Sequence, residues 1–370
     1  MCRIENNRNS NIELLRIISM LMIVGYHLAY YGVWKEQIWM EGAELNRWVI
    51  CMLFPGGQVG VAAFFIISGY FLVDKVAISL KRIICELFFY GALSTAIMIC
   101  YLLIQRKTFG MARLELINTI VHFLIDPYLS TWWFPTTYIV LLLMAPVINS
   151  VLRRLNSRGM TVVFLYCWIV IFGLATGETL FYELHKALMF YVAGAFIRKA
   201  DVPKVLKHRW VIISIAVSTW MMCSAVRYYV MVNGAADSAG RSYMENMITS
   251  LISDLSWVVL TPLCAISLFL LLRSFKISDK RVNAVAATTF GVYLLHDAPY
   301  IRYVIWKELL KIDTVYMRKY FLFIAVADII VIFACCALID IARVIYIEPQ
   351  MFQIINEKTG IFRNRYYKKE

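Results

Sequence analysis

The chain has 370 residues, of which 61% are apolar and only 16% are charged, and its mean hydropathy is +0.68. Soluble domains are roughly half apolar and a quarter charged, so this composition excludes an ordinary soluble domain and indicates a polytopic membrane protein. The formal net charge of +13 then indicates basic loops that face anionic lipid rather than a nucleic-acid partner.

Apolar runs long enough to cross a bilayer recur along most of the chain. A span needs about 20 mostly apolar residues, so the sequence predicts an all-α, polytopic membrane helical bundle of about ten transmembrane helices. The predicted spans are residues 12–33, 47–73, 80–104, 131–152, 160–177, 180–198, 210–232, 247–272, 284–307 and 318–346. The run 113–125 is shorter and predicts an interfacial helix.

The distribution of basic residues predicts the orientation and the domain boundaries. With the N-terminus inside, loops on the inner side carry 22 Lys and Arg residues and loops on the outer side carry 12, Arg227 and Arg302 among them. The positive-inside rule therefore predicts a multi-pass protein of the plasma (inner) membrane with both termini in the cytoplasm. Residues 1–11, which lack the apolar core of a signal peptide, form a cytoplasmic segment before the transmembrane domain 12–346, and residues 347–370 form a basic cytoplasmic tail.

Nine cysteines fall almost entirely inside the apolar runs. None forms a CxxC pair, and no His/Cys cluster has metal-ligand spacing, so we interpret the cysteines as packing residues and expect no metal site.

The first apolar run, "LLRIISMLMIVGYHLAYYG", contains two ionisable residues, Arg16 and His27. At about 100° and 1.5 Å per residue, they differ by only about 20° around the helix and stand about 16 Å apart along it. Ionisable residues in a span are costly and usually line a cavity or pair with one another, so the shared face predicts a polar path inside the bundle. The alternatives are a snorkelling anchor for Arg16 and an interhelical hydrogen bond for His27.

Two further stretches carry residues of interest before the middle of the chain. "GGQVGVAAFFIISGYFL" (56–72) combines small residues with a Phe-Phe pair, which indicates either close helix packing or a tight backbone beside a ligand passage. In "SLKRIICELFF", Lys81 and Arg82 open the third helix. They are either a snorkelling pair at the membrane surface or a site that captures a phosphorylated cofactor.

The stretch "TFGVYLLHD" places His296 and Asp297 about a dozen residues into the ninth predicted span. Their depth in the membrane is comparable with that of His27. The carboxylate could therefore orient either imidazole. The alternative is that both are ordinary polar residues at a helix end.

These motifs occur in a characteristic order: Arg16, ten residues and His27; "FFIISGY"; an arginine opening helix three; "WWF…Y…L…P"; and "GVYLLH". In this order they resemble the integral-membrane acyltransferase-3 family, which includes bacterial O-acetyltransferases of surface polysaccharides, lipopolysaccharide and peptidoglycan. The resemblance covers about residues 15–345, and the chain is similar to the stand-alone members without an extra extracytoplasmic domain.

The resemblance implies a ten-helix enzyme that uses cytoplasmic acyl-CoA, commonly acetyl-CoA, to modify a glycan on the other side of the lipid bilayer. Arg16, Lys81 and Arg82 are expected to hold the donor, and His27 is expected to meet its thioester as general base or transient acyl acceptor. Glu13, Ser68, His296 and Asp297 are the expected supporting residues. The acceptor and the choice between acetyl and a larger group such as succinyl stay open.

Two other functions compete with an acyltransferase. A secondary transporter predicts two halves with helices broken by Gly or Pro at matching places, and the sequence has no such internal symmetry. The second is a polysaccharide-repeat flippase or assembly partner without chemistry of its own.

Overall fold

A computed structural model describes residues 9–35, 37–104, 132–173, 180–199, 208–235, 252–253 and 256–353. The described residues form helices and contain no strand. The predicted interfacial helix 113–125 lies outside the described residues, as does most of the predicted tail 347–370.

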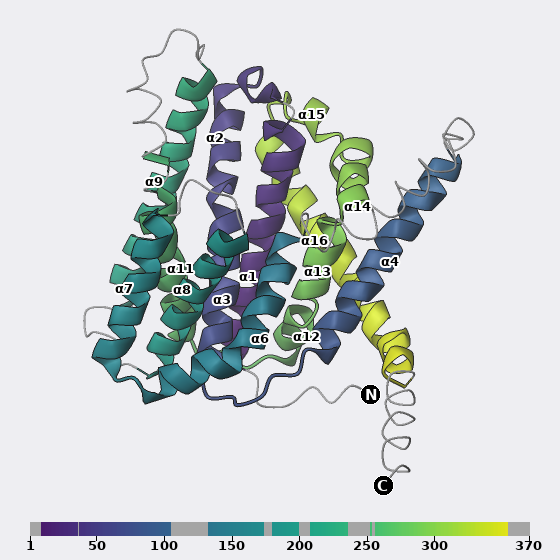
Figure 1. The fold of residues 1–370 in the computed structure, drawn as a ribbon. Coiled ribbons are helices and arrows are strands. Elements are labelled where there is room, and N and C mark those ends of the chain that lie inside the picture. Colours follow the sequence, from purple (N-terminus) through teal and green to yellow (C-terminus); the bar gives the residue numbers. More distant parts are fainter. Residues whose placement is uncertain are drawn as a thin grey trace.

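The first quarter of the chain forms the centre of the bundle (Figure 1). Helix α1 spans Ser10–His27 and continues as a π-helical segment, Leu28–Trp34. After a short 3₁₀ turn at Ile38–Met40, α2 (Glu44–Leu53) and α3 (Pro55–Leu72) follow each other so closely that they form one crossing. Pro55 is tolerated there because the first turn of a helix does not need its missing N–H group.

The middle of the chain contributes helices that run alternately up and down beside this centre (Figure 1). Their bounds are Lys81–Ile104 for α4, Trp133–Arg154 for α6, Ser157–Gly173 for α7, Leu180–Lys199 for α8 and Arg209–Ala235 for α9.

The last third of the described chain is built from shorter pieces until the final helix. A π-helical segment at Ser256–Leu260 leads into α11. The other elements are α11 (Thr261–Arg273), α12 (Lys280–Ala286), α13 (Thr289–His296), α14 (Pro299–Tyr303), the π-helical segment Val304–Leu309, α15 (Ile312–Val315) and α16 (Phe321–Tyr346).

The prediction of one helix over 284–307 is therefore wrong, because the chain turns before α13 and again after it. At the first turn, the hydroxyls of Thr288 and Thr289 donate to the carbonyls three residues earlier, which competes with regular helical bonding. At the second turn, Pro299 cannot donate to the helix that precedes it. The second break leaves His296 and Asp297 at a helix end inside the protein.

By length and composition, six described segments could cross a membrane. They are Ser10–Trp34, Glu44–Leu72, Lys81–Cys100, Trp133–Arg154, Arg209–Val232 and Phe321–Tyr346, and two shorter apolar helices cover Ser157–Val170 and Val258–Arg273. The all-α polytopic bundle is confirmed, whereas the number ten stays a prediction. Helix α8 is long enough to cross but carries four charged side chains, Glu183, Lys186, Arg198 and Lys199.

The glycine in "FFIISGY" serves close packing between α3 and α8. A Cβ atom on Gly69 would collide with the backbone carbonyl of Tyr191, and one on Gly194 would collide with that of Ile66. The two backbones approach each other at a glycine from each helix, as is common where helices pack within membranes. This crossing fixes α3, and with it Ser68, beside the centre of the bundle.

Candidate functional site

The fold brings two histidines from opposite ends of the sequence into direct contact. His27 ends α1 and His296 ends α13, and their Nδ1 and Nε2 atoms lie 2.8 Å apart. His296 is fully buried and His27 is 7% exposed. The sequence predicted that both residues lie at a similar depth, and the structure joins them in one hydrogen bond.

The backbone fixes which ring nitrogens of the pair carry protons. His296 Nδ1 lies 2.6 Å from the carbonyl oxygen of Val292, which can only accept, so this nitrogen donates. When both rings are neutral, His296 Nε2 must then accept the proton of His27 Nδ1. The remaining nitrogen, His27 Nε2, therefore holds a free lone pair, which is what a general base requires.

A carboxylate and an arginine lie beside the pair. Asp297 Oδ1 is 3.8 Å from His27 Nδ1 and 3.5 Å from the guanidinium of Arg302. Arg302 also donates a 2.7 Å hydrogen bond to the hydroxyl oxygen of Tyr31, one helical turn after His27. Asp297 is 2% exposed, so its charge is placed to stabilise a positive charge on His27, and Arg302 holds that carboxylate in place.

Arg302 is the site residue that sequence analysis missed, because it was counted among the outer loop charges. The available signal was its position five residues after Asp297, across Pro299, which allows the chain to fold back on itself.

Among the described residues, aromatic rings connect Ser68 to the histidine pair. Its hydroxyl lies 3.2 Å from that of Tyr138. Tyr138 stacks on Phe134 with ring centroids 5.9 Å apart, and Phe134 packs against Tyr293 at 5.1 Å. Tyr293 in turn lies 6.0 Å from the His296 ring. Ser68 therefore supports the wall behind the site rather than contacting the reacting groups.

Glu13 and Arg16 form a pair of their own near the start of α1. Arg16 Nη1 lies 3.7 Å from Glu13 Oε2, and 30% of the Arg16 side chain is exposed while Glu13 is buried. Arg16 Nε and Glu13 Oε2 are buried without a hydrogen-bond partner in the described residues. The pair is loosely held, which leaves the guanidinium able to take an anionic ligand.

Lys81 and Arg82 lie beside the residues that follow α16. Arg82 Nε is 3.5 Å from Glu348 Oε1 with 41% of the arginine side chain exposed, and the Lys81 ammonium lies 4.8 Å from the Phe352 ring centroid. The start of α1, the start of α4 and the end of α16 share one end of the bundle, the lower end in Figure 1. The three predicted donor-binding cations therefore lie toward the same end, opposite to the end at which α1 reaches His27.

A second buried polar cluster joins α4 to α16, and sequence analysis did not predict it. Arg343 donates to Asp340 (2.7 Å), Glu86 (2.9 Å) and Glu348 (3.1 Å). Asp340 also accepts a 2.7 Å hydrogen bond from Tyr90. The signal was an acidic and a basic residue three positions apart in an otherwise apolar helix.

This cluster packs against the "GVYLLH" motif. A Cβ atom on Gly291 would collide with the carboxylate of Asp340, so only glycine fits there. The motif therefore carries two features, Gly291 toward α16 and His296 toward α1.

No group of three His, Cys, Asp or Glu residues suited to a metal ion occurs among the described residues. The eight cysteines in the described part of the chain are free, and six of them are buried.

A family model for an acyltransferase domain, Acyl_transf_3, matches residues 9–340. Comparisons with curated proteins and with solved structures found no match. The matched range runs from the residue before α1 into α16 and includes both histidines of the pair. It favours an enzyme over a transporter or a flippase without chemistry of its own. The chain belongs to the acyltransferase-3 family and is a membrane acyltransferase.

Proposed function

We propose that this acyltransferase moves an acyl group, acetyl in the simplest case, from cytoplasmic acyl-CoA to a hydroxyl of a cell-surface or lipid-linked glycan. The observation that carries the proposal is the His27–His296 hydrogen bond, which directs the lone pair of His27 away from its partner. A hydroxyl is a weak nucleophile at neutral pH, so its transfer chemistry needs a base of this kind.

In the proposed reaction, the acceptor hydroxyl attacks the thioester carbonyl while His27 Nε2 takes its proton. The new C–O bond forms, the tetrahedral intermediate collapses, and the C–S bond breaks. The thiolate of coenzyme A leaves and takes the proton back from His27. Asp297, 3.8 Å from His27 Nδ1, stabilises the imidazolium that exists between the two proton transfers.

The donor is proposed to enter from the end of the bundle where α1 begins. Arg16, Lys81 and Arg82 are cations at that end, and phosphates of coenzyme A suit them. From Arg16 the helix rises about 16 Å to His27, which is of the order of an extended pantetheine arm. With both termini in the cytoplasm of a plasma-membrane protein, this path leads outward from the acyl-CoA pool.

His27 serves in this proposal as a general base, and the alternative is that it carries the acyl group covalently. Mixing the purified protein with acyl-CoA in the absence of acceptor, followed by acid quench and mass spectrometry, separates the two. Detection of an acylated peptide that contains His27 would show that His27 carries the acyl group covalently and does not act as a general base.

The donor and acceptor are tested by mass spectrometry of surface glycans. A deletion strain is complemented with the wild-type gene or with His27→Ala, both at equal membrane levels. We expect the wild type alone to restore an acyl increment on the glycan, and the mass of the increment identifies the acyl group. Equal acylation in both strains would overturn the proposal.

A further inference from the structure

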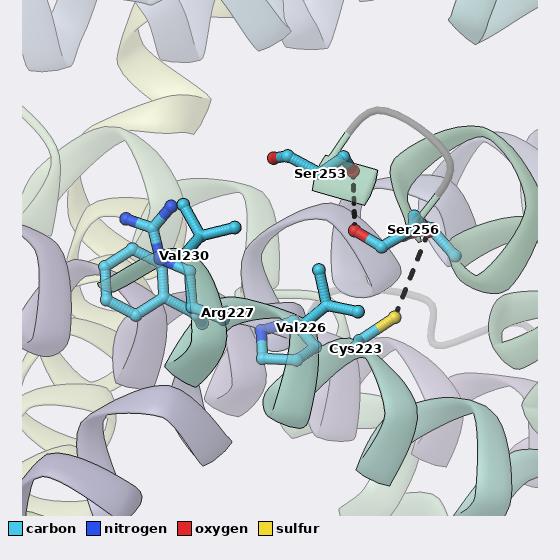
Figure 2. A pocket seen from close by; sticks show the side chains of 9 residues that line it. Cys223, Val226, Arg227, Val230, Ser253 and Ser256 are labelled. Atoms are coloured by element: carbon cyan, nitrogen blue, oxygen red, sulfur yellow. Dashed lines mark hydrogen bonds between the residues drawn. The ribbon is translucent and has the colours of Figure 1, made fainter. Parts of the chain in front are cut away.

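A small pocket lies where the α2–α3 junction faces α9 and the π-helical segment Ser256–Leu260. Phe54, Arg227, Ser253 and Ser256 contribute to its lining. Figure 2 shows the Ser256 hydroxyl turned back on the Ser253 carbonyl, to which it donates at 2.7 Å. The Ser256 hydroxyl is therefore not free to donate to a ligand. The charged residue in the lining is Arg227.

The guanidinium of Arg227 lies against two aromatic rings, and no carboxylate of the described residues pairs with it. Its central carbon lies 4.0 Å from the ring centroids of both Trp34 and Phe54. The Nε atom is buried without a hydrogen-bond partner, and no ion pair forms between Arg227 and a carboxylate in the described residues. The two rings satisfy none of the N–H groups of the guanidinium, and a charged group in this position is costly unless it is paired.

The acidic side chain of the neighbouring helix α2, Glu44, contacts Tyr228. Glu44 accepts a hydrogen bond from the Tyr228 hydroxyl at 3.4 Å. A second arginine, Arg47, lies on α2 one turn before Cys51, and its Nε atom is also buried without a partner in the described part of the chain. The neighbouring helices α2 and α9 thus each carry an arginine whose Nε atom is buried without a partner in the described residues.

An aromatic surface connects this region to the histidine pair. Tyr26 packs against His27 with ring centroids 5.4 Å apart, and against Phe54 at 5.6 Å. The Phe54 ring in turn contacts the guanidinium of Arg227. In addition, the π-helical segment that begins after His27 ends at Trp34, whose ring also contacts the guanidinium of Arg227. Such π-helical segments frequently occur at functional sites.

We propose that Arg227 binds an anionic group of the acceptor, a phosphate or a carboxylate, while the acceptor hydroxyl lies at His27. The planar guanidinium fork matches these oxoanions in a bidentate manner. The inference rests on the proposed function, and it specifies the acceptor as an anionic saccharide or saccharide lipid.

Binding of a simple probe tests the anion site without catalysis. The full-length protein in maltoside micelles free of phospholipid is titrated with radiolabelled dodecyl phosphate, with dodecanol as the uncharged competitor. We expect Arg227→Gln to weaken binding at least tenfold, since a charge-assisted bidentate contact is lost. Arg227→Lys should recover part of the affinity, which also guards against a folding defect.

The matched control is Arg209→Gln, at the other end of the same helix, where the guanidinium already donates to the Ser274 carbonyl at 2.8 Å. This variant should bind the probe as the wild type does. Equal affinity in wild type, Arg227→Gln and Arg209→Gln, or displacement of the probe by dodecanol, would overturn the anion site.

Activity measurements distinguish an acceptor from a lipid headgroup. Arg227→Gln should lower glycan acylation in the complemented strain at least tenfold at equal membrane levels, whereas Arg209→Gln should acylate glycan as the wild type does. If added phospholipid displaces the probe and the variant acylates glycan normally, the pocket holds a headgroup and the acceptor role is wrong. If the wild type binds the probe through Arg227 but transfers no acyl group, the anion site stands and the proposed function fails.

Discussion

Two buried polar clusters in this bundle differ in how many of their side-chain nitrogen atoms have a hydrogen-bond partner. In the cluster around Arg343, each guanidinium nitrogen binds a different carboxylate, those of Asp340, Glu86 and Glu348. In the cluster around His27, one imidazole nitrogen binds His296, and the other has no partner in the described residues. Arg343 is 1% exposed and His27 is 7% exposed, so burial does not separate the two.

The difference indicates different roles. In the ionic cluster between α4 and α16, every nitrogen of Arg343 binds a carboxylate, and these contacts hold the two helices in register, although Asp340 Oδ2 is buried without a hydrogen-bond partner in the described residues. The histidine pair leaves a basic nitrogen uncommitted in a buried position, which is the arrangement expected where a proton is to be taken from a substrate. Substitutions in the first cluster should therefore change stability, and those in the second should change the rate.

The largest structural effect is expected from Arg343→Met. Removal of this cation leaves Glu86 and Asp340 buried without a counter-charge, at a cost of about 3–5 kcal/mol in the free energy of unfolding. Denaturant unfolding in detergent measures it, with Arg153→Met at the exposed end of α6 as the control. A loss below about 1 kcal/mol would mean that the cluster is not a stabilising one.

The next effect concerns the partner of the base. His296→Leu removes the acceptor of the His27 Nδ1 proton, so the imidazole can rotate or change tautomer, and the transfer rate should fall about 10–100-fold. His296→Gln keeps an acceptor oxygen and should retain more activity than the leucine variant. The unfolding midpoints of both should stay close to that of the wild type. Similar rates for glutamine and leucine would remove the tautomer argument.

A smaller effect is expected at the donor end. Arg82→Ala should raise the KM for acyl-CoA about tenfold, as for a lost charge-assisted hydrogen bond, with less change in acceptor use, and lysine should restore part of the affinity. The control is Glu348→Gln, which removes the 3.5 Å partner of Arg82. Should Glu348→Gln raise the KM as much as Arg82→Ala does, the arginine acts through its contact with Glu348 and not on the donor.

The orientation of the protein in the membrane can be tested by cysteine labelling, without an activity assay. Glu41 and Ser157 are exposed; Glu41 lies just before α2 and Ser157 begins α7, and these two helices start at opposite ends of the bundle (Figure 1). In a background without Cys2 and without Cys100 and Cys335, the exposed cysteines of the described residues, Glu41→Cys should react with an impermeant thiol reagent on intact cells, and Ser157→Cys should not. Gly42 is unsuitable because a Cβ atom there would collide with Tyr316. Labelling of Ser157→Cys alone would reverse the orientation and the donor path.

Sequence analysis predicted the elements of the histidine site because membrane spans make ionisable residues rare. In an apolar run, His27 and the His296–Asp297 pair stand out, and their distances from the helix starts give comparable depths. The pairing itself could not be derived from this. It depends on α13 ending at His296, and the sequence pattern treated 284–307 as one helix.

The remaining features depend on contacts between segments far apart in the sequence. Arg302 was counted with the outer loop charges, yet it reaches back to Asp297 and Tyr31. Arg82 was interpreted as a snorkelling residue or a phosphate ligand, and its contact with Glu348 could not be derived from either interpretation. Arg227 was one of the outer charges, and only the crossing of α9 with the α2–α3 junction places it over Phe54.

The account depends most on His27 Nε2 as the group that accepts the proton of the acceptor hydroxyl. The direct measurement is the rate of acyl transfer by purified His27→Ala protein at saturating acyl-CoA and glycan acceptor, beside the wild type. We predict a fall of about 10²–10⁴-fold, the range for a lost general base, with the unfolding midpoint and the acyl-CoA affinity unchanged. A rate within threefold of the wild type, measured in correctly folded protein, would contradict the account.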